Sequence, residues 1–172
     1  MKYNLGSNDV RHEGFINIDI RPAKGVDIVD DVTKLEKIED NSAEEIIAHN
    51  ILEHIFPDKM DSTLALWVRK LKPGGFLTIG VPDGEMVYER YLKDTEKNYE
   101  RRWEKLVHGI FGNFRFLREW HGEDAEKYGH HNLFSHKYLT AKMEQAGLEN
   151  IVDANQNHPD CFDLKGQKPC VQ

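Results

Sequence analysis

Hydrophobic and polar residues alternate within the first fifty positions in a way that is typical of short β-strands. The clearest case is the segment 15–20, which alternates apolar and polar side chains and ends at Arg21-Pro22. Shorter apolar stretches at residues 2–5, 26–29 and 45–48 are each followed by polar or turn-forming residues. The pattern therefore predicts four strands before residue 50.

Beyond residue 57 the apolar period becomes helical. Large apolar residues recur three or four positions apart from Met60 to Leu71. Pro57 stands where a helix begins, and Gly74-Gly75 stands where we expect that helix to end. A buried strand is predicted to follow over residues 76–81.

In the last quarter of the chain, a second helix is again followed by strand candidates. Ser135 is a favoured N-cap and Gly147 a favoured C-cap, so a helix is predicted between them. Residues 150–154 and 161–164 are the last strand candidates.

Strands that alternate with helices predict an α/β fold with a mostly parallel sheet and helices on both faces. Residues 1–172 suit one domain. Only about ten residues join the first two strands, so no helix is expected there. The segment 84–132 is long for a connection and rich in Tyr, Trp and Leu, so we expect a helical insertion, and insertions of this size are often lids.

Composition limits the partners. The net charge is -7, which disfavours binding to phosphate backbones, so a small-molecule substrate is expected and nucleic acid is not. The basic stretch 101–105 is interpreted as a solvated helix face. No apolar run is long enough to cross a membrane, and the N-terminus carries no signal-like run. Cys161 and Cys170 form no CxxC motif, so a reduced, cytoplasmic protein is expected.

Polar residues follow each of the first five predicted strands. They are Gly6-Ser7, Asp19, Asp30-Asp31, His49-Asn50 and Pro82-Asp83. In open α/β sheets ligands bind at the carboxyl ends of the strands, near the point where strand order reverses. A carboxylate there can accept hydrogen bonds from ribose hydroxyls, and an acidic site favours a cationic ligand.

The same segments carry a family resemblance. Leu71-Lys72-Pro73-Gly74-Gly75-Phe76-Leu77 is the most specific of five ordered matches, and the others are residues 4–7 with 14–19, 31–35, 40–44 and 49–54. Together they resemble small class I S-adenosylmethionine-dependent methyltransferases of the type 11 kind. The resemblance implies a Rossmann-like sheet of about seven strands with an antiparallel last strand, and S-adenosylmethionine as the cofactor.

The resemblance also implies a cofactor-binding set. Its members are Gly6, Ser7, Asn8, Asp19, Ile20, Asp31, Val32 and His49. Asp19 would bind the ribose, and Asp31 with the backbone of Val32 would bind the adenine. Gly6, Ser7 and His49 would line the methionine and ribose region.

Two departures from the family pattern bear on this site. Asn8 stands where the glycine-rich loop usually has its second glycine, although Asn tolerates positive φ. The chain also starts at the first strand, without the family's preceding helices. The site is then open, or is closed by the 84–132 insertion or by a second subunit in a homodimer. A non-catalytic methyltransferase-fold protein that acts as a binding or interaction module is the alternative function.

Histidines cluster near the predicted lid. They are His121, His130, His131 and His136. His130 and His131 are the catalytic candidates, since either could act as a general base near the methyl acceptor. Structural roles remain an alternative, and no strong metal motif is present, so no metal site is predicted. The expected function is methyl transfer to a small-molecule or saccharide-like acceptor. A nucleotide-dependent oxidoreductase is disfavoured because the chain lacks a G-x-G-x-x-G turn leading into a helix.

Overall fold

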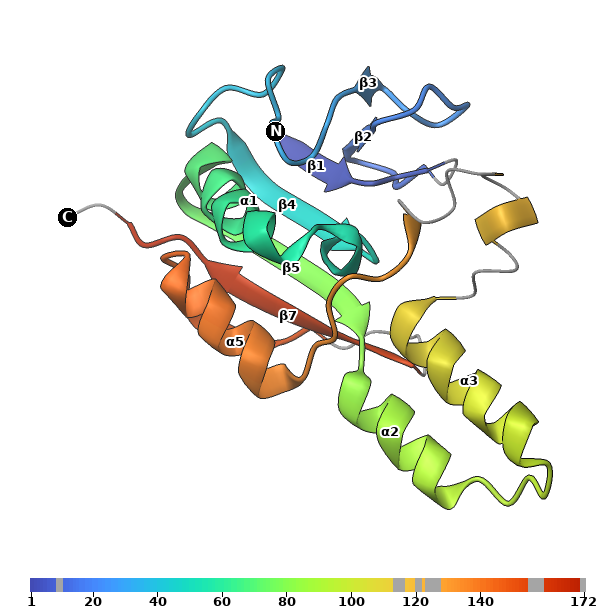
Figure 1. The fold of residues 1–172 in the computed structure, drawn as a ribbon. Helices are drawn as coiled ribbons and strands as arrows, with labels where there is room; N and C mark the ends of the chain where they lie inside the picture. The colour runs from blue at the N-terminus through green and yellow to red at the C-terminus, as the bar shows by residue number, and fades with distance from the viewer. Residues whose placement is uncertain (9–10, 113–116, 120–121, 123–127, 155–159, 171–172) are drawn as a thin grey trace.

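The computed structural model describes residues 1–8, 11–112, 117–119, 122, 128–154 and 160–170. A seven-stranded sheet forms the centre of the molecule, with strand order β3-β2-β1-β4-β5-β7-β6 (Figure 1). The strands are β1 (Lys2–Leu5), β2 (Ile16–Asp19), β3 (Ile28–Val29), β4 (Ala43–His49), β5 (Leu71–Pro82), β6 (Glu149–Asp153) and β7 (Cys161–Gln167). Strands β1 to β5 pair in parallel, whereas β7 is antiparallel to both β5 and β6. The predicted Rossmann-like sheet with an antiparallel last strand is confirmed.

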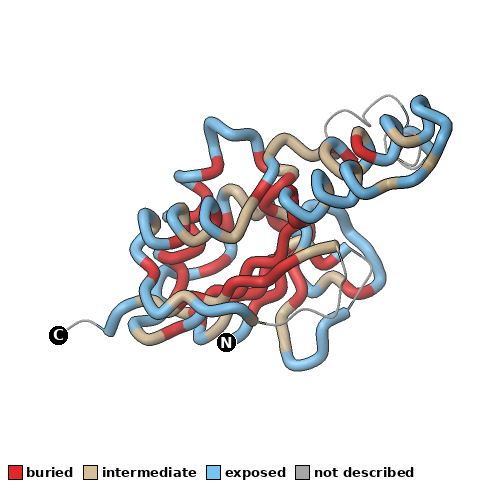
Figure 2. The backbone as a smooth tube through the Cα atoms, turned by 90° about the horizontal axis from the view of Figure 1, so that it is seen from below, coloured by how far each residue is buried: buried red, intermediate tan, exposed pale blue. Residues whose placement is uncertain are grey.

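The helices are α1 (Pro57–Lys70), α2 (Gly84–Lys93), α3 (Tyr99–Phe111) and α5 (His136–Gln145), with a 3-10 turn η1 (Leu52–His54) before α1. Helices α1 and α5 contact each other and pack beside β5 and β7 (Figure 1). They cover the alternating apolar residues of the central strands, among which Leu5, Ile46 and Ile79 are buried. Figure 2 shows the buried segments of the chain in red, gathered in the centre of the molecule.

Several of the alternate strand positions are polar. Glu45 of β4 lies between Lys2 at 2.8 Å and Lys165 at 2.9 Å, and the Asn4 amide donates to the Asn17 side chain at 3.0 Å. Among residues 1–8 and 11–49 there is no helix. A loop joins β1 to β2, as expected. It is tied to β2 where the backbone N–H of His12 donates to the Asn17 side chain at 2.9 Å.

One sequence prediction about this sheet is wrong. Helix α1 ends at Lys70, and Leu71 is already extended and paired with Ala43 of β4, so Gly74-Gly75 does not end the helix. These glycines lie within β5, where the register to β4 shifts. Gly74 has a φ of 78°, and a Cβ on Gly75 would lie 2.9 Å from the Lys72 carbonyl oxygen. Strand pairing ends the helix, and the glycines permit the close backbone approach that follows.

The expected helical insertion is a hairpin of α2 and α3 that projects beyond the end of β5 (Figures 1 and 2). Asp83 caps α2, since its Oδ1 accepts from the backbone N–H of Glu85 at 3.0 Å and of Met86 at 3.1 Å. A Cβ on Gly109 of α3 would lie 2.6 Å from the Val87 side chain, so the two helices approach closely there. The polar residue after β5 therefore has a structural task at the start of the hairpin.

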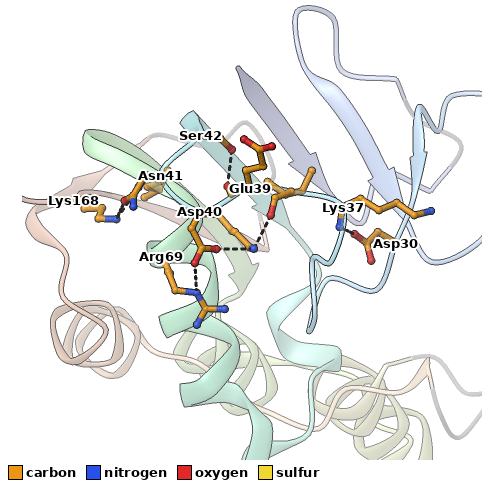
Figure 3. A network of polar contacts seen from close by, with 11 residues as sticks. Asp30, Lys37, Glu39, Asp40, Asn41, Ser42, Arg69 and Lys168 are labelled. Carbon is orange, nitrogen blue, oxygen red and sulfur yellow. Dashed lines mark hydrogen bonds and ion pairs between the residues drawn. The ribbon is translucent and has the colours of Figure 1, made fainter.

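A polar network fixes the long loop between β3 and β4 (Figure 3). The buried Lys70 ammonium donates to the Ile38 carbonyl at 2.6 Å and to Asp40 at 2.8 Å, and Arg69 pairs with the other Asp40 oxygen at 3.0 Å. At the start of the loop, Asp30 accepts from the backbone N–H of Lys37 at 2.9 Å. The end of α1 thus holds the loop whose first residues lie at the carboxyl ends of the strands.

No helix within the described ranges is long and apolar enough to span a bilayer.

Candidate functional site

The strand order reverses between β1 and β4, and a cavity of about 490 Å³ lies at the carboxyl ends of the strands there. We call it the switch-point cavity. Its wall includes Gly6 after β1, Asp19 at the end of β2, Asp31 after β3 and Asn50 after β4. Four separate strand ends therefore converge on one space, as parallel strands of one sheet require.

Asp19 connects two of these strand ends. One carboxylate oxygen accepts from the backbone N–H of Asn8 at 2.8 Å, and the other accepts from the backbone N–H of Arg21 at 3.0 Å. Asn8 has a φ of 51°, so it adopts the left-handed conformation that was expected at this position. A carboxylate oxygen has two acceptor positions. Asp19, which is only 7% exposed, can therefore hold the loop and still accept from a ligand in the cavity.

The absence of a side chain at Gly6 has a packing reason. Gly6 has a φ of 67°, and a Cβ there would lie 2.0 Å from Cγ1 of Ile51. Ile51 lines the switch-point cavity beside Gly6. The glycine thus lets the loop after β4 pack onto the loop after β1, in addition to opening the backbone to a ligand.

The β3 side of the cavity is formed by Asp31 and Val32. Partial burial opposes the ionisation of Asp31, but the hydroxyl and amide of Thr33 and the ammonium of Lys34 outweigh it and hold its pKa below the usual value. The Val32 carbonyl accepts from the indole N–H of the fully buried Trp67 at 2.8 Å. Helix α1 therefore positions the backbone at Val32 through Trp67. The sequence pattern had indicated Trp67 only as an apolar position of the helix.

Six of the eight residues implied for cofactor binding line this cavity: Gly6, Asn8, Asp19, Ile20, Asp31 and Val32. Ser7 and His49 do not line it. Ser7 is buried, with its backbone N–H donating to the Ile18 carbonyl at 3.0 Å. The His49 imidazole lies 3.4 Å from Asp163 of β7, across Gly80 of β5.

Other lining residues were missed by the sequence reasoning. Arg21 places its guanidinium 5.6 Å from the centre of the Tyr128 ring, and both residues line the cavity together with Leu117. Leu117 and Tyr128 come from the 84–132 insertion, so this segment contributes to the cavity wall. Arg21 could have been noticed because it follows Asp19 at the strand end. No pattern in the sequence marks Leu117 or Tyr128, since only the path of the insertion brings them here.

A second cavity of about 330 Å³ lies between the sheet and the α2–α3 hairpin, and we call it the hairpin cavity. Pro82 and Cys161 line it from the sheet, and Val87 and Leu106 line it from the hairpin. Asn50 and His54 line both cavities. The two spaces are therefore neighbours, and these two side chains lie at the boundary between them.

Glu53 lies in the wall of the hairpin cavity, and its side chain is 1% exposed. Neither carboxylate oxygen has a hydrogen-bond partner on another residue that the structure describes. Burial raises the pKa of Glu53 to about 8. Its backbone carbonyl accepts from the backbone N–H groups of His131 at 2.7 Å and Asn132 at 3.2 Å, which fixes the end of the insertion against η1.

Two histidines accompany Glu53. The ring centres of His54 and His130 are 4.9 Å apart, and the His54 Nδ1 lies 3.2 Å from the Gly129 carbonyl oxygen. Burial, with the neighbouring His130, lowers the pKa of His54 to about 4. Burial is also the main reason that the pKa of His130 is lowered. Both rings are therefore uncharged near neutral pH.

The other candidate histidines lie elsewhere. His131 stacks on Phe56, with ring centres 4.1 Å apart, and lines neither cavity. His136 stacks on Phe162 at 3.9 Å and lies 3.2 Å from Asp153. His121 falls outside the described residues. Of the two catalytic candidates, His130 lines the hairpin cavity and His131 lines neither of the two cavities.

The amino-acid sequence matches no protein-family model and no curated protein. Solved structures do match. A SAM-dependent methyltransferase from Methanosarcina mazei superposes with a TM-score of 0.62 at 13% identity, over 99% of this chain and 92% of its own. The 1,6-didemethyltoxoflavin-N1-methyltransferase from Burkholderia thailandensis, solved with S-adenosylhomocysteine, gives 0.61 at 12% identity, over 98% and 70%.

A possible exported protein from Bordetella parapertussis gives a TM-score of 0.54 at 14% identity, over 83% of this chain, and the chain spans 43% of that protein's length. At these identities the likeness concerns the arrangement of the backbone. The chain has the fold of the class I SAM-dependent methyltransferases.

Proposed function

We propose that this protein is an S-adenosylmethionine-dependent methyltransferase that uses the switch-point cavity for the cofactor and the hairpin cavity for the acceptor. The observation that carries the proposal is the convergence of Gly6, Asp19 and Asp31 on one cavity at the strand switch point. In this proposal Asp19 accepts the ribose hydroxyls, and Asp31 with the backbone of Val32 binds the adenine.

The neighbouring cavities suit a direct displacement. Methyl transfer requires donor and acceptor to be aligned, and it benefits from the exclusion of water. Asn50 and His54 line both cavities, so the sulfonium methyl group would be presented at this boundary. The acceptor would approach from the hairpin side, where His130 faces it.

The hairpin cavity limits the acceptor. A space of about 330 Å³ holds a small molecule or one saccharide unit. Arg90 and Asp160 pair with each other and also line it, so the wall offers polar groups of both signs. A small hydroxylated or saccharide-like acceptor is therefore the substrate class that we propose.

Calorimetry with S-adenosylmethionine and S-adenosylhomocysteine tests the cofactor assignment. We expect binding with a micromolar dissociation constant, about 8 kcal/mol. A parallel thermal-shift series should show stabilisation by S-adenosylhomocysteine and none by NAD, because a ligand stabilises only the state that it binds. Absence of binding by both adenosyl ligands would refute the proposal and would favour the non-catalytic alternative.

The acceptor is tested separately by measuring S-adenosylhomocysteine release with a panel of small alcohols, sugars and amines. We expect release with hydroxylated acceptors. Turnover restricted to amines or to macromolecules would contradict the proposed substrate class without affecting the cofactor assignment.

A further inference from the structure

Glu53, His54 and His130 form a compact set of metal-ligating side chains in the wall of the hairpin cavity. Each offers one ligand atom, and these atoms all lie within 4.8 Å of one another. Glu53 and His54 are neighbours in η1, whereas His130 is brought to them by the returning end of the insertion. We propose that these three residues bind a divalent transition-metal ion, of which zinc is the best match.

The buried carboxylate is the strongest sign of a missing partner. Both Glu53 oxygens are buried and accept no hydrogen bond from another described residue, although buried polar groups are normally hydrogen-bonded or coordinate a metal. Glu53 lies on the wall of the hairpin cavity together with His54 and His130. A divalent cation would supply the partner that this carboxylate lacks.

The ring nitrogen of His54 that would not bind the metal already has a hydrogen-bond partner. Its Nδ1 lies 3.2 Å from the Gly129 carbonyl oxygen, and its Nε2 lies 4.0 Å from the Glu53 carboxylate. Metal-binding histidines usually donate their other N–H to a backbone carbonyl or a carboxylate, which orients the ring. His54 thus has the arrangement of a ligand that would bind through Nε2.

The ligand types and spacing indicate the class of metal. Two imidazoles and one carboxylate suit zinc and related first-row ions, and a set of three leaves a coordination position open. Ligand atoms bound at about 2.1 Å in tetrahedral geometry lie roughly 3.4 Å apart. The observed spread of up to 4.8 Å is wider, so the side chains would have to rotate inward to bind one ion.

The catalytic role of the ion depends on the proposed function. Binding of the ion by Glu53, His54 and His130 does not depend on it. An acceptor hydroxyl would take the open position, and the ion would lower its pKa, so that its proton passes to water at the cavity mouth. The resulting oxygen would form the O–CH₃ bond as the S–CH₃ bond breaks, with that electron pair left on sulfur. His130 is then a metal ligand in place of the general base that its sequence position suggested.

Titration of the EDTA-treated full chain with Co²⁺ tests the site, because cobalt replaces zinc and gives visible absorption bands in a histidine-containing site. We expect one Co²⁺ per chain, displaced by Zn²⁺. Glu53→Gln and His130→Ala should each weaken binding by at least ~10-fold. His12→Ala is the matched control, since it removes an exposed histidine that lines neither cavity.

Circular dichroism and S-adenosylhomocysteine affinity are measured on the same variants. Glu53 and His130 do not line the switch-point cavity, so both variants should keep their fold and their affinity for this ligand. Absence of a bound Co²⁺ in the wild type, or unchanged Co²⁺ affinity in both variants, would overturn the metal site. If the wild type does not bind S-adenosylhomocysteine, the proposed function is refuted instead. The Co²⁺ titration would still decide whether the metal site exists.

Discussion

Gly6→Ala tests the packing that joins the loops after β1 and β4. The new methyl group would lie 2.0 Å from Cγ1 and 2.2 Å from Cδ1 of Ile51, far inside van der Waals contact. It would also have to adopt a φ of 67°, which is unfavourable for alanine. Two separate costs therefore act at one position.

The structure gives a magnitude for each cost. Left-handed backbone in a non-glycine residue costs about 1 kcal/mol, and forcing an extra methyl into a packed site costs about 1–3 kcal/mol. Gly6→Ala should therefore destabilise the protein by about 2–4 kcal/mol. Ile51→Ala in the same chain removes the clashing atoms, so the double variant should recover about 1–3 kcal/mol relative to additivity.

Urea unfolding followed by tryptophan fluorescence, to which the buried Trp67 contributes, measures these differences. Gly14→Ala is the matched control, because Gly14 has a φ of 82° and nothing within 4 Å of an added Cβ. It should show only the backbone cost of about 1 kcal/mol. If Gly6→Ala and Ile51→Ala are additive within ~0.5 kcal/mol, the packing argument is refuted.

Three further predictions concern the two cavities. Asp19→Asn should weaken S-adenosylhomocysteine binding by about 10–100-fold in calorimetry, because a charged acceptor for hydroxyl groups is lost; unchanged affinity would remove Asp19 from the site. Trp67→Phe should destabilise the protein by about 1–3 kcal/mol in urea, because the Val32 carbonyl loses its indole partner; a change below ~0.5 kcal/mol would contradict this. Burial raises the pKa of Cys161 to about 11, so roughly one thiol in a thousand is ionised at pH 8 and alkylation should speed up about tenfold per pH unit up to pH 10. Mass spectrometry should find the exposed Cys170 modified first, and equal rates at pH 8 would count against the burial of Cys161.

Local sequence patterns were sufficient to predict several helices and strands and the residues that meet at the carboxyl ends of the first strands. The alternation over residues 15–20 and the caps Ser135 and Gly147 predicted strand β2 and helix α5 because these signals act within a few residues. The polar residues after β1, β2 and β3 were expected to meet because the carboxyl ends of parallel strands share one edge. Gly6, Asp19 and Asp31 do line one cavity.

The predicted end of the first long helix was wrong, because the same residue type can serve in more than one kind of local structure. Gly74 and Gly75 are typical helix-ending residues, yet the pairing of Leu71 with β4 ends the helix first. The role of His49 in cofactor binding stays a prediction; its imidazole lies 3.4 Å from Asp163, and it does not line the switch-point cavity. A strand residue points to one face or the other, and only the register of the assembled sheet decides which.

By itself, the sequence determined a mostly parallel sheet, its helices and the carboxylates at the strand ends, because periodicity and turn chemistry are local properties. The antiparallel last strand was implied only by the family resemblance. Only the tertiary structure decided that Glu53 and His54 would meet His130 from 75 or more positions away, and that Leu117 and Tyr128 would reach the switch-point cavity. These contacts depend on the path of the insertion across the sheet edge. Long-range packing of this kind has no periodic trace in the chain, so it becomes visible only once the fold has brought the segments together.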